Sequence, residues 1–164
     1  MRPKRRRAST PRDVSRLAVV LVVFGLASNG TPAPAQEKPY PIFTAEHFVS
    51  AMKTVGQAFV AARASIGRSE FEDSKSYLVI SRDRLATTIT FWRDRKKDDA
   101  IGMLRDTLTK MDDLDVALSA AKIDPAAVAA RVEQVGAACQ ACHAIYREQD
   151  PVTKVYKLKT STAE

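Results

Sequence analysis

Apolar residues recur three and four positions apart along four stretches of the chain, which is the pattern of amphipathic helices packed along a common seam. The first helix is predicted over about 44–66, before Gly67, a residue suited to the end of a helix. The second is predicted from Ser69 to about Trp92, and Ser69 and Glu72 have the spacing of a capping box. The inward-facing positions of these two helices are Phe48, Met52, Val55, Phe59, Ala62 and Ile66, followed by Phe71, Leu78, Leu85, Ile89 and Trp92.

Two further helices are predicted after a short charged connector. The third helix is expected to begin with Asp98 or Asp99 as its N-cap. The fourth is expected to begin at Asp124, with Pro125 at the first helical position, and to end before Asp150. Their inward-facing positions are Ile101, Leu104, Leu108, Met111, Leu114 and Leu118, followed by Val128, Val132, Val135, Cys139, Cys142 and Tyr146.

Four amphipathic helices joined by short links predict an all-α fold, an antiparallel four-helix bundle. The bundle core is expected over about 42–150, within a single domain of residues 36–164. No stretch shows strand-like alternation of any length. The segment 152–164 either extends the last helix or lies along the surface.

The first 35 residues have the pattern of a secretory signal peptide. Seven basic residues and one acidic residue between positions 1 and 16 precede an apolar run of 11 residues, 17–27. A small-residue site follows, and cleavage is expected before Gln36. The apolar run is short for a spanning helix, which needs roughly 20 residues, so an uncleaved anchor is the weaker interpretation. The mature protein is therefore predicted to be exported to the periplasm, without a membrane span.

Most of the positive net charge of the chain lies in the predicted leader. The whole chain carries +7, and the seven basic and one acidic residues of the leader account for +6, which leaves +1 for residues 36–164. A mature chain so close to neutral has no basic stripe for nucleic acid. Nucleic acid is therefore not expected among its partners.

Both cysteines of the chain and one of its two histidines lie in the stretch CQACH, residues 139–143. On a helix, Cys139 and Cys142 project from nearly the same side, and His143 lies one turn beyond Cys139. C-x-x-C-H is the sequence sign of a c-type haem attachment, in which two thiols bond to the porphyrin and the imidazole binds its iron. This arrangement favours covalent haem.

Three other interpretations of CQACH compete with haem, besides chance. A disulfide suits an exported chain, but one within a single helical turn closes a very small loop and adds little stability. A thioredoxin-type redox pair is expected near a βαβ pattern, which this chain lacks. Tetrahedral zinc needs four ligands, and only His47 remains to join the three here. No nucleophile–base pair is evident, so an enzyme is not predicted.

The stretch VGAACQACHAIYR, residues 135–147, resembles the signature G-x-x-C-x-x-C-H-x-x-[FY]-[RK] of the cytochrome c′ and cytochrome c-556 family, the class II c-type cytochromes. The resemblance covers about residues 42–150. It implies one haem c bound covalently at Cys139 and Cys142, with His143 as the proximal iron ligand. It also implies that Arg147 lies beside the haem, near a propionate or the imidazole, although a solvated arginine at a helix end is the alternative.

The family divides at the opposite face of the haem. The stretch from Met52 to Gly56 resembles the M-K-x-x-G segment in which the c-556 type carries a methionine ligand, so Met52 is the expected distal ligand. In the cytochrome c′ type an apolar side chain covers an open iron, and Phe48 is the candidate for that role. His47 is a third candidate, although it points away from the seam.

The resemblance implies a periplasmic one-electron carrier that meets its redox partner proteins transiently. A cytochrome c′-like protein that binds NO or CO at a five-coordinate haem is the alternative, and a helical protein with a disulfide and no cofactor is a third. Family members often dimerise through their first two helices, so a homodimer is a further implication.

Overall fold

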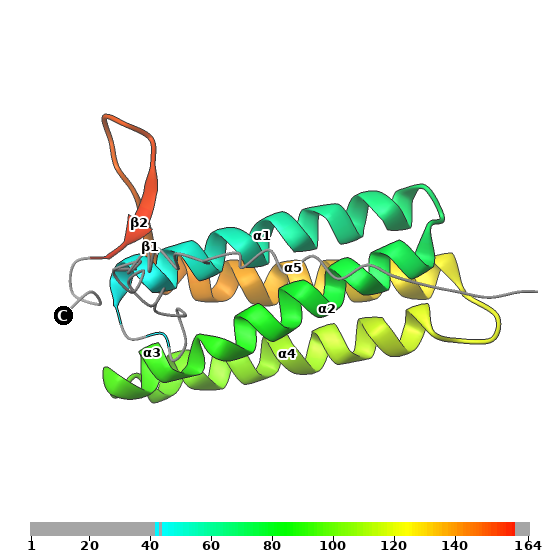
Figure 1. Cartoon of the computed structure of the whole chain (residues 1–164), viewed down its shortest axis with the longest axis horizontal. Helices are drawn as coiled ribbons and strands as arrows, with labels where there is room; N and C mark the ends of the chain where they lie inside the picture. The colour runs from blue at the N-terminus through cyan, green and yellow to red at the C-terminus, as the bar shows by residue number, and fades with distance from the viewer. Residues whose placement is uncertain (1–41, 43, 160–164) are drawn as a thin grey trace, which may run out of the picture. The chain divides into compact units, whose positions relative to one another are not determined.

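The computed structural model describes residue 42 and residues 44–159. The predicted signal peptide, residues 1–35, and the end of the chain, residues 160–164, lie outside the described residues. The described part is mostly helical, which confirms the predicted helical character (Figure 1). Its elements are the helices α1 (Ala45–Gly67), α2 (Phe71–Thr87), α3 (Ile89–Asp94), α4 (Asp98–Leu118) and α5 (Pro125–Tyr146), and the strands β1 (Arg147–Gln149) and β2 (Tyr156–Leu158). Among these helices, none is both long enough and apolar enough to span a bilayer.

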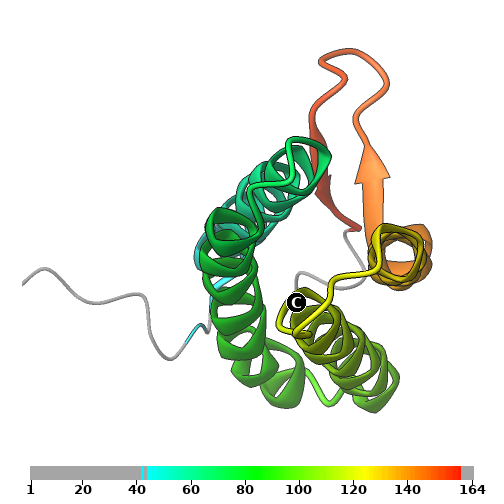
Figure 2. The same ribbon diagram turned by 90° about the vertical axis from the view of Figure 1, so that its right-hand side faces the viewer.

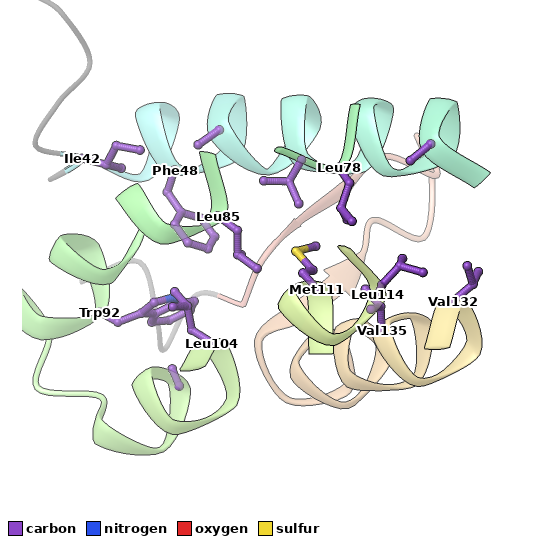
Figure 3. Close-up of a cluster of buried hydrophobic side chains, with 14 of the residues drawn as sticks. Ile42, Phe48, Leu78, Leu85, Trp92, Leu104, Met111, Leu114, Val132 and Val135 are labelled. Carbon is purple, nitrogen blue, oxygen red and sulfur yellow. The ribbon is translucent and has the colours of Figure 1, made fainter. Parts of the chain in front are cut away.

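The long helices pack in sequence, α1 along α2, α2 against α4 and α4 against α5 (Figure 2). One group of buried side chains is aromatic: the ring of Phe48 stacks on Phe91 at 4.3 Å and meets Trp92 edge-on at 4.9 Å. A second group is aliphatic and includes Leu78, Met111, Leu114, Val132 and Val135 (Figure 3). Burying these large apolar side chains supplies most of the driving force for folding.

Two helix starts were read correctly from the sequence. The Thr44 side chain accepts a hydrogen bond from the backbone N–H of His47 at 3.2 Å, so α1 begins where its pattern predicted. Asp124 likewise accepts from the N–H of Ala126 at 2.9 Å, with Pro125 in the first turn of α5. Each cap satisfies a backbone donor that the helix itself leaves without a partner.

The predicted N-cap of α4, Asp98 or Asp99, was one or two residues too late. Lys97 is the N-cap and makes no side-chain capping bond, while Asp98 and Asp99 lie inside the first turn. Carboxylates there still favour the helix, because they face the positive end of its dipole.

The junction between α1 and α2 also differs from the prediction. Gly67 is the last residue of α1, and the left-handed backbone conformation falls on Ser69, with φ of 60°. The N–H of Glu70 donates to the carbonyl of Ser65 at 2.9 Å, which closes the end of α1. Because Ser69 takes part in that closure, it does not cap α2. The predicted capping box is absent, and Glu70 is an N-cap without a side-chain bond.

The second predicted helix is not continuous, because it breaks at Thr88 between α2 and α3. The hydroxyls of Thr87 and Thr88 each donate to a carbonyl three residues back, at 2.7 Å. Such side-chain bonds compete with the backbone ladder of a helix. Beyond the break, the hydroxyl of Thr90 accepts from the N–H of Ile42 at 3.1 Å and donates to its carbonyl at 3.0 Å. These two bonds anchor Ile42 to α3.

The segment after α5 is a β-hairpin, up to the last described residue. Helix α5 ends at Tyr146, and β1 pairs antiparallel with β2, with Arg147 opposite Leu158. The segment therefore does not extend the last helix, which corrects one of the two alternatives, and its strands were not predicted. The hairpin lies beside the C-terminal end of α5 and contacts α1 through β2 (Figure 1).

Candidate haem site

A cavity of about 630 Å³ lies between α1 and α5, and residues of α2, α3, α4 and the hairpin complete its wall. Its volume falls within the roughly 300–1,000 Å³ of sites that hold cofactors and other small molecules. Most of the lining is apolar, with Val55, Phe59, Leu85 and Leu104 among the wall residues. An apolar wall of this kind suits a large, mostly hydrophobic ligand.

Both cysteine side chains of α5 line this cavity. Cys139 and Cys142 are half-buried and not joined in a disulfide. Burial raises the pKa of both thiols, and that of Cys142 reaches about 11 because Cys139 and Asp99 add to the effect. Both are therefore neutral near pH 7. A redox-active pair has the opposite property, since its reactive thiol has a lowered pKa.

His143 lines the same cavity and carries a buried ring nitrogen without a partner. Its Nδ1 makes no hydrogen bond to any described residue. Burial lowers the pKa of His143, and the positive charge of Arg147 lowers it further, which favours the neutral ring. A neutral imidazole is the form that binds a metal. A buried nitrogen left without a partner is costly, and a group that contacts Nδ1 itself would remove that cost.

Helix α1 brings two of its three candidate side chains to the cavity. Met52 is half-buried and lines it, and Phe48 lines it one turn earlier. The ring of Phe48 is buried and contacts Phe91 and Trp92, whereas Met52 is partly buried against the core and has a flexible thioether. His47, the third candidate, is not among the lining residues.

The C-terminal end of α5 is fixed by Tyr146, which lies one turn after Cys142. Its hydroxyl donates to the carboxylate of Asp99 on α4, and its ring lies 4.7 Å from that of Trp92. This bond lowers the pKa of Asp99, and burial together with the bond raises the pKa of Tyr146. Tyr146 thus holds the end of α5 that carries Cys142 and His143 against α4.

Arg147 follows directly at the edge of the cavity. It is the first residue of β1, and its guanidinium lies 4.0 Å from the centre of the Tyr156 ring. Arg147 is therefore an arginine at a helix end that is half-buried and stacked, and its position beside a haem stays a prediction.

Sequence reasoning missed two parts of the wall. Met103 of α4 lines the cavity, although it falls outside the inward-facing positions predicted for its helix. The hairpin contributes residues 155–158, which no periodic signal marked.

In the described part of the chain, no group of three or more His, Cys, Asp or Glu side chains could hold a metal ion, so the structure offers no zinc set around the two thiols.

These features fit the group that the motif predicts. The cavity is large and apolar, two neutral thiols project from one helix, and an imidazole nitrogen beside them lacks a partner.

Comparisons of the chain with protein-family models, with curated protein sequences and with solved structures gave no match. The motif and this geometry are therefore the features from which a function can be inferred.

Proposed function

We propose that the chain is an exported c-type haem protein that carries single electrons. The observation that supports it best is that Cys139, Cys142 and His143 line one cavity together with Met52 of the facing helix. In this proposal the four long helices form an antiparallel four-helix bundle of the class II cytochrome type. The leader, residues 1–35, directs the protein to the periplasm, where redox partner proteins dock transiently.

The side chains of α5 hold the cofactor in this proposal. Cys139 and Cys142 provide the sulfurs of two thioether bonds, and His143 provides the proximal nitrogen ligand. Bound haem supplies the one-electron chemistry of its iron. Helix α5 presents all three donors on one side, and the bond from Tyr146 to Asp99 holds its C-terminal end in place.

The side chains of α1 complete the site. Met52 provides a thioether, a soft ligand that suits haem iron and raises its potential. The wall that includes Phe48 and Phe59 is mostly apolar, so charge transferred at the site would be screened less than in water. With His143 and Met52 both available as donors, bound iron would keep the same protein ligands in both oxidation states, and its reorganisation would be small.

The first test is whether mature protein carries haem. The full chain is expressed in a host with a haem maturation system, and its intact mass is measured along with a haem-stained gel. The expected product lacks residues 1–35 and carries one haem, and a double Cys139→Ala, Cys142→Ala variant carries none. A colourless mature protein with free thiols would overturn the proposal.

The second test concerns Met52. The oxidised protein is expected to show a methionine-to-iron charge-transfer band that disappears in Met52→Ala. Met103→Ala is the matched control, because Met103 lines the same cavity from α4, and this variant should keep the band. A band that survives in Met52→Ala would remove Met52 from the iron.

A second function, NO or CO binding at a five-coordinate haem, is favoured by one observation. Phe48 lines the cavity one turn before Met52 and could cover an open iron position. Rapid CO binding by the reduced protein, unchanged in Met52→Ala, would support this function and refute the six-coordinate electron carrier.

A further inference from the structure

A side-chain hydrogen bond joins the last turn of α5 to the first turn of α4. The hydroxyl of Tyr146 donates it to the carboxylate of Asp99. Tyr146 is only 7% exposed, and its ring lies 4.7 Å from the ring of Trp92 on α3. Both turns lie at the same end of the helices as the hairpin (Figure 1). The carboxylate is therefore tied to a side chain that is itself packed in the core.

Asp99 lies outside the wall of the cavity. Tyr146 and Cys142 line the cavity one helical turn apart, whereas Asp99 does not. Asp99 is exposed, but the bond from Tyr146 is the largest of the effects that lower the pKa of its carboxyl below the ordinary value of 3.8. The charge of Lys97 has the smallest effect on this pKa. At neutral pH the carboxylate is therefore ionised and held by Tyr146.

The charge of Asp99 acts on one of the two thiols of the motif. Burial is the main cause of the raised pKa of Cys142, and Cys139 and Asp99 add to it. The pKa of Cys139, one turn earlier on α5, is raised by burial without a contribution from Asp99. Among the residues that the structure describes, no other carboxylate contributes to the shifted pKa values of the two thiols or of His143.

A fixed negative charge near Cys142 matters for the proposed electron transfer. Loss of an electron from bound haem adds one positive charge to the site. A carboxylate nearby stabilises the oxidised form more than the reduced form, and so lowers the reduction potential. A carboxylate that rotated freely in water would spend part of its time farther away, so its effect would be weaker.

We propose that Asp99 lowers the reduction potential of the haem site from outside the cavity, and that Tyr146 is the positioning residue that holds the Asp99 carboxylate near Cys142. This proposal rests on the proposed function. It assigns a role to two side chains that neither bind the iron nor bond to the cofactor.

The test is the reduction potential of the haem-loaded protein in wild type and in Asp99→Asn, measured by redox titration. Asparagine has nearly the shape of aspartate without its charge. The potential should rise, and the equilibrium constant for reduction should increase roughly two- to fivefold at low salt, because Asp99 is exposed and water screens its charge. The increase should largely disappear near 1 M salt, where the screening length is about 3 Å. A purely structural effect of the substitution would not depend on salt in this way.

Asp98→Asn is the matched control. Asp98 lies in the same turn of α4, is exposed and carries the same charge, but the bond from Tyr146 goes to Asp99. Its loss should leave the potential close to that of wild type. Equal shifts in the two variants, or a potential in Asp99→Asn that matches wild type, would overturn the proposal.

Tyr146→Phe tests the positioning role. This variant keeps the charge of Asp99 and the buried ring but removes the bond between them, so the potential should rise by less than in Asp99→Asn. A double variant of both residues should have the potential of Asp99→Asn, since Tyr146 acts through the carboxylate. Additive shifts in the double variant, or no shift in Tyr146→Phe, would show that Tyr146 does not position the charge.

Failure of this proposal can be distinguished from failure of the proposed function. A haem-loaded protein with the same potential in every variant would overturn this proposal alone. A mature wild-type protein without haem would overturn both.

Discussion

The thiol of Cys142 offers a direct test of the environment that the structure assigns to the motif. Burial raises its pKa to about 11, and Cys139 and Asp99 add to the effect. The informative perturbation is Cys139→Ala in protein expressed without haem maturation, because it leaves Cys142 as the sole thiol of the chain. Burial is the largest cause of the raised pKa and is unaffected by that substitution, so Cys142 should remain a weak acid.

The expected rate follows from two opposing effects. An ordinary thiol has a pKa of 9.0, so a pKa of about 11 would lower the thiolate fraction near neutral pH by about 100-fold, which is an upper limit for the variant because the contribution of Cys139 is gone. A more basic thiolate is also a better nucleophile, and a Brønsted coefficient of about 0.4–0.5 recovers roughly 6- to 10-fold of that loss. The folded protein should therefore react roughly ten times more slowly than an unhindered thiol.

The assay is thiol–disulfide exchange with an aromatic disulfide reagent, followed by absorbance. The same variant unfolded in guanidinium chloride is the control, because its thiol is fully solvated. The rate in the folded protein should keep rising with pH beyond 9.0, where the control levels off. A folded-state rate equal to or above that of the control would mean that the thiolate is stabilised. That result would refute the neutral-thiol environment and favour the redox interpretation of the pair.

Three further predictions concern stability and are measured by urea unfolding. Thr90→Val should cost about 1–3 kcal/mol, because it leaves the buried backbone groups of Ile42 without their partner; no loss would mean that water replaces the hydroxyl. Leu114→Ala should cost about 2–5 kcal/mol, since Leu114 is fully buried; a loss below this range would show that the core can collapse into the space. Tyr146→Phe should destabilise the protein at neutral pH. The hydrogen bond from Tyr146 lowers the pKa of Asp99 below its ordinary value of 3.8. The bond therefore stabilises the folded state above pH 3.8, and this stabilisation is lost as the pH falls through the lowered pKa of Asp99. The difference from wild type should therefore shrink in acid, and a constant difference would refute this cause.

The helices of this fold could be read from the sequence because their signals are local. Thr44 and Asp124 cap the helices that follow them, and the apolar period identifies which face turns inward. The break at Thr88 could not be read in this way, because Leu85 and Ile89 continue the period across it. The break depends on threonine hydroxyls that compete for carbonyls, and on a contact with Ile42 from a distant part of the sequence.

The β-hairpin could not be predicted from the sequence for a different reason. Each strand has three residues, which is too short for a period of two to stand out. The hairpin depends on the turn at Asp150, on the stack between Arg147 and Tyr156, and on the contact of β2 with α1. Only the first of these is local, and an aspartate before a proline is common in many kinds of turn.

The spacing of residues along α5 predicted that the two cysteines share one face of the helix. It did not predict how deeply they are buried. The period of α5 places Cys139 and Cys142 on the same face as Val128, Val132 and Val135, and so predicts that all five are buried alike. The valines are at most 7% exposed, but both cysteines are only half-buried and face the cavity. The seam between the helices is therefore closed along the first half of α5 and open at the motif. If the helices packed as closely at Cys139 and Cys142 as they do at the three valines, the thiols would have no room for a ligand. The lower burial of these two cysteines therefore supports the proposal of a bound group.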